Sequence, residues 1–156
     1  MIRGARYLYA ALAWAFVAGI LLQVYFVGLG IFAGKENLDL HASFGWILHL
    51  GPLPVLVIAA LARAGRARIL QATALAVTIF FVPILAAVRA DLPLLAAIHP
   101  VGALVAFWLA ILVARGATSL AGTSDADTRT PVRDWVLVAL VVLIVLVLSF
   151  SGSPNS

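Results

Sequence analysis

The sequence contains no cysteine and very little charge. The absence of cysteine from its 156 residues excludes disulfides, iron–sulfur clusters and thiolate metal ligands. Charged residues make up only 10% of the chain and hydrophobic residues 65%, which is far more apolar surface than a soluble domain of this length can bury. The composition therefore excludes a soluble globular protein and predicts an all-α integral membrane protein.

Five apolar stretches are long enough, or nearly so, to cross a bilayer core, which needs about 20 helical residues. They are residues 7–33, 40–62, 69–89, 93–114 and 135–151. The first four stretches predict a four-helix transmembrane bundle over residues 1–115. A Gly-, Ser-, Thr- and Asp-rich segment over 116–134 predicts a flexible cytoplasmic linker. Residues 135–156 are expected to form a fifth transmembrane helix with a short tail.

Basic residues lie almost entirely on one side of these predicted spans. Eight of the ten Lys and Arg residues precede the first span, or lie between the second and third or the fourth and fifth. Basic loops stay in the cytoplasm, so we expect a multi-pass protein of the bacterial inner membrane with a cytoplasmic amino terminus. Topology thus explains the net charge of +4, and the expected partner is the lipid bilayer rather than nucleic acid.

Polar and helix-breaking residues interrupt the first two spans. Gln23 and Tyr25 lie in the outer half of the first span, where interhelical hydrogen bonding is their expected role. Gly51, Pro52 and Pro54 are expected to kink or loosen the second span, because proline lacks the amide hydrogen that a helix uses.

Three histidines lie within apolar segments, where ionisable groups are costly and therefore mark functional candidates. His41 and His99 are both expected near the outer ends of spans that run inward, with His99 about two turns inside the fourth span. Two imidazoles from facing helices complete the axial coordination of a haem iron, and four-helix bundles often hold cofactors in this way. The pair predicts one haem b with His41 and His99 as metal ligands. His49, deeper in the second span, is an alternative to His41.

Small residues accompany both histidines along the helix, which leaves room for a flat macrocycle and equally for another helix. The candidate cofactor-binding residues of this kind are Gly45, Gly102, Ala103 and Ala106.

Two cations are expected on the outer side, Lys35 and Arg89. They are candidate partners for the haem propionates, and solvated loop charges are the alternative interpretation. Zinc fits less well than haem, because zinc usually takes three or four protein ligands. The nearest carboxylates, Asp39 and Asp91, are expected at the edges of the outer loops.

The residues favour a mono-haem cytochrome b that exchanges electrons with a quinone or an extracytoplasmic partner protein. No nucleophile–base constellation or nucleotide-binding motif is evident, so the chain is at most part of an oxidoreductase and its status as an enzyme stays open. The alternative is a non-enzymatic subunit or scaffold without cofactor. In that case the histidines and small residues only pack helices, in a homo-oligomer or a larger membrane complex.

Two short motifs carry a resemblance to known proteins: Leu40-His-Ala-Ser-Phe-Gly45 and Ile98-His-Pro-Val-Gly-Ala-Leu104. Together they resemble a bacterial membrane family, domain of unknown function 6220, over roughly residues 5–115. More distantly, a His one turn before a Gly near a helix end is similar to haem A synthase and other b-type membrane cytochromes. This resemblance implies a four-helix haem fold with His41 and His99 as axial ligands. Di-haem cytochromes use four histidines and haem A synthase carries further catalytic groups, so the resemblance does not extend to transmembrane electron transfer or haem modification.

Overall fold

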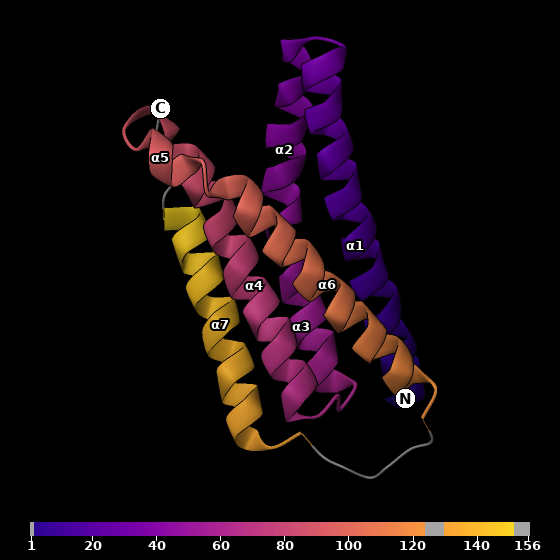
Figure 1. Cartoon of the computed structure of the whole chain (residues 1–156). Helices are drawn as coiled ribbons and strands as arrows, with labels where there is room; N and C mark the ends of the chain where they lie inside the picture. The colour runs from indigo at the N-terminus through magenta and orange to yellow at the C-terminus, as the bar shows by residue number, and fades with distance from the viewer. Residues whose placement is uncertain (1, 124–129, 152–156) are drawn as a thin grey trace.

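The structure is a computed structural model that describes residues 2–123 and 130–151. The predicted tail over 152–156 and the middle of the predicted linker, 124–129, lie outside these residues. All regular elements of the described residues are helical and run back and forth along one long axis (Figure 1). They are α1 (Ile2–Phe32), η1 (Lys35–Asn37), α2 (Leu38–Leu48), α3 (Pro52–Leu61), α4 (Arg66–Ala87), η2 (Val88–Ala90), α5 (Pro93–Ala96), α6 (His99–Ala121) and α7 (Val132–Ser151).

Five helical stretches are long and apolar enough to cross a membrane, which confirms the expected number of apolar spans. Two of the five are interrupted. The second divides into α2 and α3 directly before Pro52, as expected where a proline ring cannot continue the preceding helix.

The fourth span divides where the sequence did not lead us to expect it. A turn over residues 97–98 separates α5 from α6, and α6 begins at His99, followed by Pro100. Proline is tolerated in the first turn of a helix because the amide groups there have no intrahelical partner. His99 therefore stands at the start of a helix and not two turns inside one. At its other end α6 continues to Ala121, so residues 116–121 are helical, although the sequence suggested a linker there.

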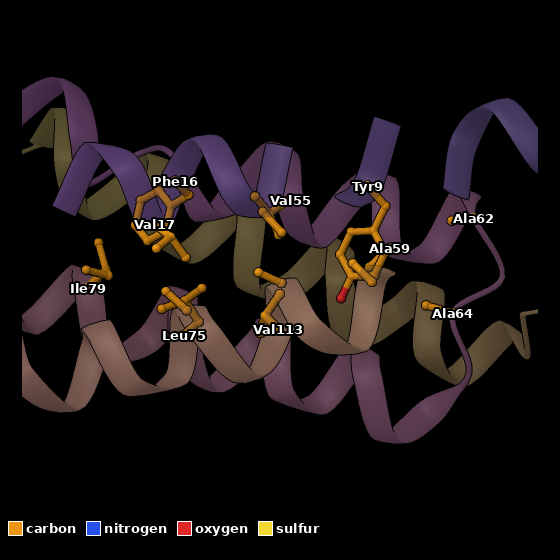
Figure 2. Packing of buried hydrophobic residues seen from close by; sticks show 14 of the residues in the cluster. Tyr9, Phe16, Val17, Val55, Ala59, Ala62, Ala64, Leu75, Ile79 and Val113 are labelled. Carbon is orange, nitrogen blue, oxygen red and sulfur yellow. The ribbon is translucent and has the colours of Figure 1, made fainter. Parts of the chain in front are cut away.

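The main hydrophobic core joins α1, α3, α4 and α6 in the half of the molecule that contains the amino terminus (Figure 2). Tyr9 and Phe16 of α1 face small residues of the opposing helices, and Tyr9 is fully buried. Alanines such as Ala59 and Ala114 are also fully buried, which allows the helix backbones to approach closely. Elsewhere many large apolar side chains are exposed, as the lipid-facing surface of a membrane protein requires.

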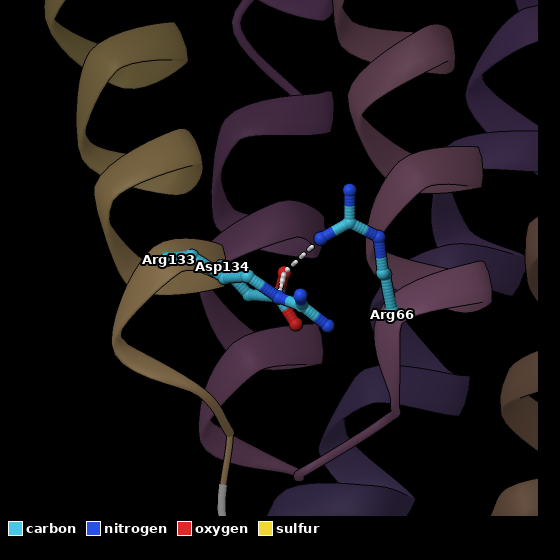
Figure 3. Close-up of polar contacts among 3 residues, drawn as sticks. All are labelled: Arg66, Arg133 and Asp134. Carbon is cyan, nitrogen blue, oxygen red and sulfur yellow. Dashed lines mark hydrogen bonds and ion pairs between the residues drawn. The ribbon is translucent and has the colours of Figure 1, made fainter.

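The helix α7 packs against α3 and α4. Its Val138 joins a second buried cluster with Leu56 and Ile69. At the start of α7, Asp134 is 1% exposed and pairs with Arg66 of α4 at 3.3 Å (Figure 3). The fifth span is therefore held by apolar packing and by an ion pair within the described part of the chain.

At the end of the molecule away from the amino terminus, α1 and α2 form a hairpin that stands apart from α5 (Figure 1). The hairpin turns at Gly34, whose φ of 134° is readily adopted by glycine alone. The candidate site lies in this half of the molecule, where the α1–α2 hairpin diverges from the other helices.

A candidate cofactor site between two histidines

A cavity of about 700 Å³ lies between α1, α2, α4 and α6 in the half that contains the α1–α2 hairpin. Its volume is within the range of about 300–1,000 Å³ that is typical of pockets for small molecules and cofactors. Apolar and small side chains form most of the wall, among them Ile20, Leu38, Ala42, Gly45, Leu48, Ile79, Val82, Pro83, Ala86, Ala87, Ala103 and Ala106. His41, His49 and His99 also line the cavity, so the fold brings all three histidines to one space.

The rings of His41 and His99 face each other across helices α2 and α6. Their centroids are 6.3 Å apart and their planes are inclined at 81°. Two imidazoles that bind one metal from opposite sides, with bonds of about 2 Å and ring centres about 1.1 Å beyond each nitrogen, have centroids about 6 Å apart. The separation of these two rings is therefore that of a pair of axial ligands.

Each of the two rings is oriented by a backbone carbonyl of a neighbouring helix. His41 Nδ1 lies 3.2 Å from the carbonyl oxygen of Gln23, and His99 Nδ1 lies 2.8 Å from that of Val82. A carbonyl can only accept, so each Nδ1 carries a proton, and in the neutral imidazole Nε2 keeps the lone pair that binds metals. Neither Nε2 makes a hydrogen bond to the described residues. A metal-binding histidine usually has its other ring nitrogen held in this way.

His49 is held differently from the other two histidines. It is 7% exposed, its Nδ1 donates to the carbonyl of Trp46 at 2.6 Å, and its Nε2 lies 3.1 Å from the hydroxyl oxygen of Ser149 on α7. Both ring nitrogens therefore have partners within the protein. The sequence left His41 and His49 open as alternatives, and the ring that approaches His99 is that of His41.

The small residues that the sequence singled out divide into two groups. Gly45, Ala103 and Ala106 line the cavity. Gly102 is not among the lining residues; a Cβ there would lie 3.2 Å from Val82, so this glycine serves the close packing of α6 on α4. The helix rotation of about 100° per residue separates Gly102 from its neighbour Ala103.

The two candidate propionate partners also differ. Arg89 lies in η2, directly after α4, and lines the cavity. Lys35 is exposed in η1 and is not a lining residue. Asp39, which the sequence placed at a loop edge, lines the cavity as well. The cavity lining thus includes one cation and one carboxylate.

Gln23 is a site residue whose role the sequence indicated only in general terms. The expected interhelical hydrogen bond is present, since Gln23 Nε2 donates to the carbonyl oxygen of His41 at 3.0 Å. Tyr25, for which the same role was expected, is 59% exposed and its ring lies near Phe26. In the sequence, Gln23 stood out only as a polar residue in an apolar span. Its partner on α2 could be identified only from the fold.

Within the part of the chain that the structure describes, no group of three or more His, Asp or Glu side chains gathers as a metal site. A zinc centre would use such a group. A haem iron between two imidazoles requires only the two that the fold brings together.

The fold and its apolar helices define a multi-pass helical membrane protein. Residues 23–90 match the sequence profile of a family of unknown function, DUF6220, which supports the resemblance to that family. The match spans just under half of the chain; it includes His41 and ends before His99. No curated protein and no solved structure matched the chain, so a similarity to haem A synthase or b-type cytochromes is not shown.

Proposed function

We propose that the protein is a membrane cytochrome that holds one haem b between His41 and His99. The observation that carries the proposal is the 6.3 Å separation of the two rings together with the hydrogen bonds that fix both Nδ1 atoms. Ordinary ring packing gives similar centroid distances, so the spacing supports the proposal only together with the two oriented Nδ1 atoms and the cavity. A centroid separation of about 6 Å is the one expected for two imidazoles that bind one iron.

The cavity supports haem over a bare ion. A bare ion needs a few ligands and little space, whereas a macrocycle needs a large apolar slot with a polar end for its propionates. The wall provides small residues at Gly45, Ala103 and Ala106, and Arg89 provides a cation in the lining. The haem would lie in the four-helix part of the bundle, with α7 outside it.

When bound, the haem supplies a one-electron redox couple. The residues of this chain would keep it six-coordinate, exclude water with the alanine-rich wall, and hold it near the α1–α2 hairpin. By the distribution of arginines this end is the extracytoplasmic one. The exchange partner would accordingly be a quinone in the outer leaflet or a redox protein outside the inner membrane.

The test is a haem titration of the detergent-purified full chain, followed by optical spectroscopy. We expect a Soret band and a b-type spectrum of the reduced protein at one haem per chain. His41→Ala and His99→Ala should each abolish the six-coordinate spectrum. His49→Ala is the matched control: it removes the third histidine of the same cavity and should leave the axial ligation intact. A wild-type protein that takes up no haem would end the proposal.

A cofactor-free scaffold is a second candidate function, because the hydrogen bonds of the two histidines also join helices. His41 and His99 connect α2 to α1 and α6 to α4 through Gln23 and Val82. A cofactor-free scaffold in a homo-oligomer or larger complex would use them in this way. In that case His41→Ala would lower stability in haem-free protein, and a stoichiometric partner would co-purify with a colourless wild-type chain.

A further inference from the structure

Gln23 and His41 are joined by two hydrogen bonds of opposite direction. The Gln23 side-chain amide donates to the His41 carbonyl at 3.0 Å, and the His41 ring donates to the Gln23 carbonyl at 3.2 Å. One residue of α1 thus contacts both the backbone and the ring of one residue of α2. Two bonds between the same two residues fix the position of α1 along α2 as well as the direction of the ring.

Gly45 makes this contact possible. It lies one turn after His41 on α2, and a Cβ at this position would be 2.8 Å from Gln23 Nε2. A larger residue would therefore force the amide end of Gln23 to shift from its present position. The glycine that the sequence suggested as a surface for a macrocycle also accommodates the amide of Gln23.

His99 has no equivalent support. Its ring donates to the carbonyl of Val82, and the side chain of Val82 is apolar and cannot return a hydrogen bond. Each ring is therefore held by one hydrogen bond from its Nδ1, but among the described residues only the backbone carbonyl of His41 accepts a second bond, from the Gln23 side chain.

From this asymmetry we infer that Gln23 is the positioning residue of the site. Its side-chain amide, bonded to the His41 carbonyl, holds α2 in the register on α1 that keeps the His41 ring against the Gln23 backbone carbonyl, and so strengthens the bond from His41 to iron. The inference rests on the proposed haem function. A histidine held in one orientation loses less freedom when it binds a metal, and substitutions of such supporting residues typically weaken metal binding by about 10- to 100-fold.

The experiment compares Gln23→Met with wild type, in full-length protein, with and without haem. Methionine keeps the length and volume of glutamine and removes the donor. With haem, we expect about tenfold faster haem loss and a changed low-spin EPR signal, because the register that keeps the His41 ring against the backbone carbonyl of residue 23 is loosened. Without haem, nitrogen NMR should show about tenfold faster solvent exchange of the His41 Nδ1 hydrogen.

Two matched controls separate positioning from general damage. Gln71→Met makes the same chemical change on α4, where Gln71 lies near Gly116 and outside the cavity lining. Gly28→Ala adds a methyl group on α1 where nothing lies within 4 Å. Both variants should behave as wild type in all three measurements.

A double-mutant cycle sharpens the test. Gly45→Ala should reproduce the changes of Gln23→Met, because its methyl group displaces the amide. The cycle is measured in haem-free protein by exchange of the His41 Nδ1 hydrogen, because Gly45 also lines the cavity. In a Gln23→Ala background the amide is absent, so Gly45→Ala should have little further effect on this exchange. Additive effects would mean that Gly45 acts independently of Gln23 and would overturn the inference.

The outcomes distinguish the inference from the proposed function. If wild type binds no haem, the cytochrome proposal fails, and the NMR arm still decides whether Gln23 orients His41. If wild type binds haem and Gln23→Met matches Gln71→Met in haem loss, EPR signal and hydrogen exchange, the haem proposal stands and the positioning role is refuted.

Discussion

The two ends of this helical bundle use their polar groups in opposite ways. At the end that contains the amino terminus, arginines donate to groups on other helices: Arg6 to the carbonyl of Thr123, Arg68 to that of Gly116, and Arg66 to the carboxylate of Asp134. At the other end, His41 and His99 each bond to another described residue through one ring nitrogen. The first end uses its polar groups to join helices, whereas at the second end both histidines also line a shared cavity.

This difference matters because unpaired polar groups inside a membrane protein are costly. A bundle that needed its histidines only for packing could satisfy both nitrogens of each ring, as it does for His49 through Trp46 and Ser149. Within one cavity, His49 thus has both ring nitrogens bonded to the protein, whereas His41 and His99 each have one such bond among the described residues, as the proposed ligation requires.

The largest expected effect is a loss of stability when the ion pair at the end that contains the amino terminus is broken. Among the described residues, Arg66→Ala leaves the buried Asp134 with Arg133 at 3.8 Å as its ion-pair partner, and we expect a loss of about 2–3 kcal/mol. Asp134→Ala should cost only about 1 kcal/mol, because the remaining Arg66 is 53% exposed and can be hydrated. Reversible unfolding in detergent measures both values. Haem uptake should be unchanged in each variant, and equal costs for the two variants would contradict the account of this pair.

The next effect in size comes from filling the cavity while both histidines stay in place. Ala106 is fully buried and lines the cavity, so Ala106→Leu should reduce haem affinity by about tenfold or more through overpacking. Val105→Leu, at a neighbouring position that is 45% exposed, is the control and should bind as wild type does. Haem titration of both variants measures the difference. Equal affinities would show that the haem lies elsewhere.

The smallest effect concerns the two outer cations. Arg89 lines the cavity and Lys35 does not. A cation near the haem favours the reduced iron, so Arg89→Gln should lower the midpoint potential by roughly 30 mV, which corresponds to about a threefold change in preference. Lys35→Gln should change it much less, because exposed charges are screened. A redox titration that found equal shifts would remove Arg89 from the site.

Much of this arrangement could be predicted from the sequence, because apolar runs determine spans directly. The five spans and the break before Pro52 followed from composition and proline chemistry. The candidate pair His41 and His99 followed from the cost of placing ionisable groups in apolar segments. These features depend on neighbours in the sequence or on the membrane, so no knowledge of the packing was needed.

The remaining features depend on contacts between helices distant in sequence. The carbonyl of Val82 that orients His99, and the contact of Ser149 with His49, cannot be read from any local pattern. Gly102 and Ala103 are adjacent in sequence and differ in role only because α6 turns one towards α4 and the other towards the cavity. Helix periodicity predicted that the small residues lie near the histidines on one helix face. Only the packing showed which of them line the cavity.

The most direct test of the central claim is an EPR spectrum of the oxidised, haem-loaded wild-type protein. Two histidine ligands make ferric haem low-spin, and planes inclined at 81°, as those of His41 and His99 are, predict a strongly anisotropic signal of this type. That signal should disappear in His41→Ala and in His99→Ala. A high-spin ferric signal in wild type would mean that at least one of the two histidines does not bind the iron, and would contradict the account.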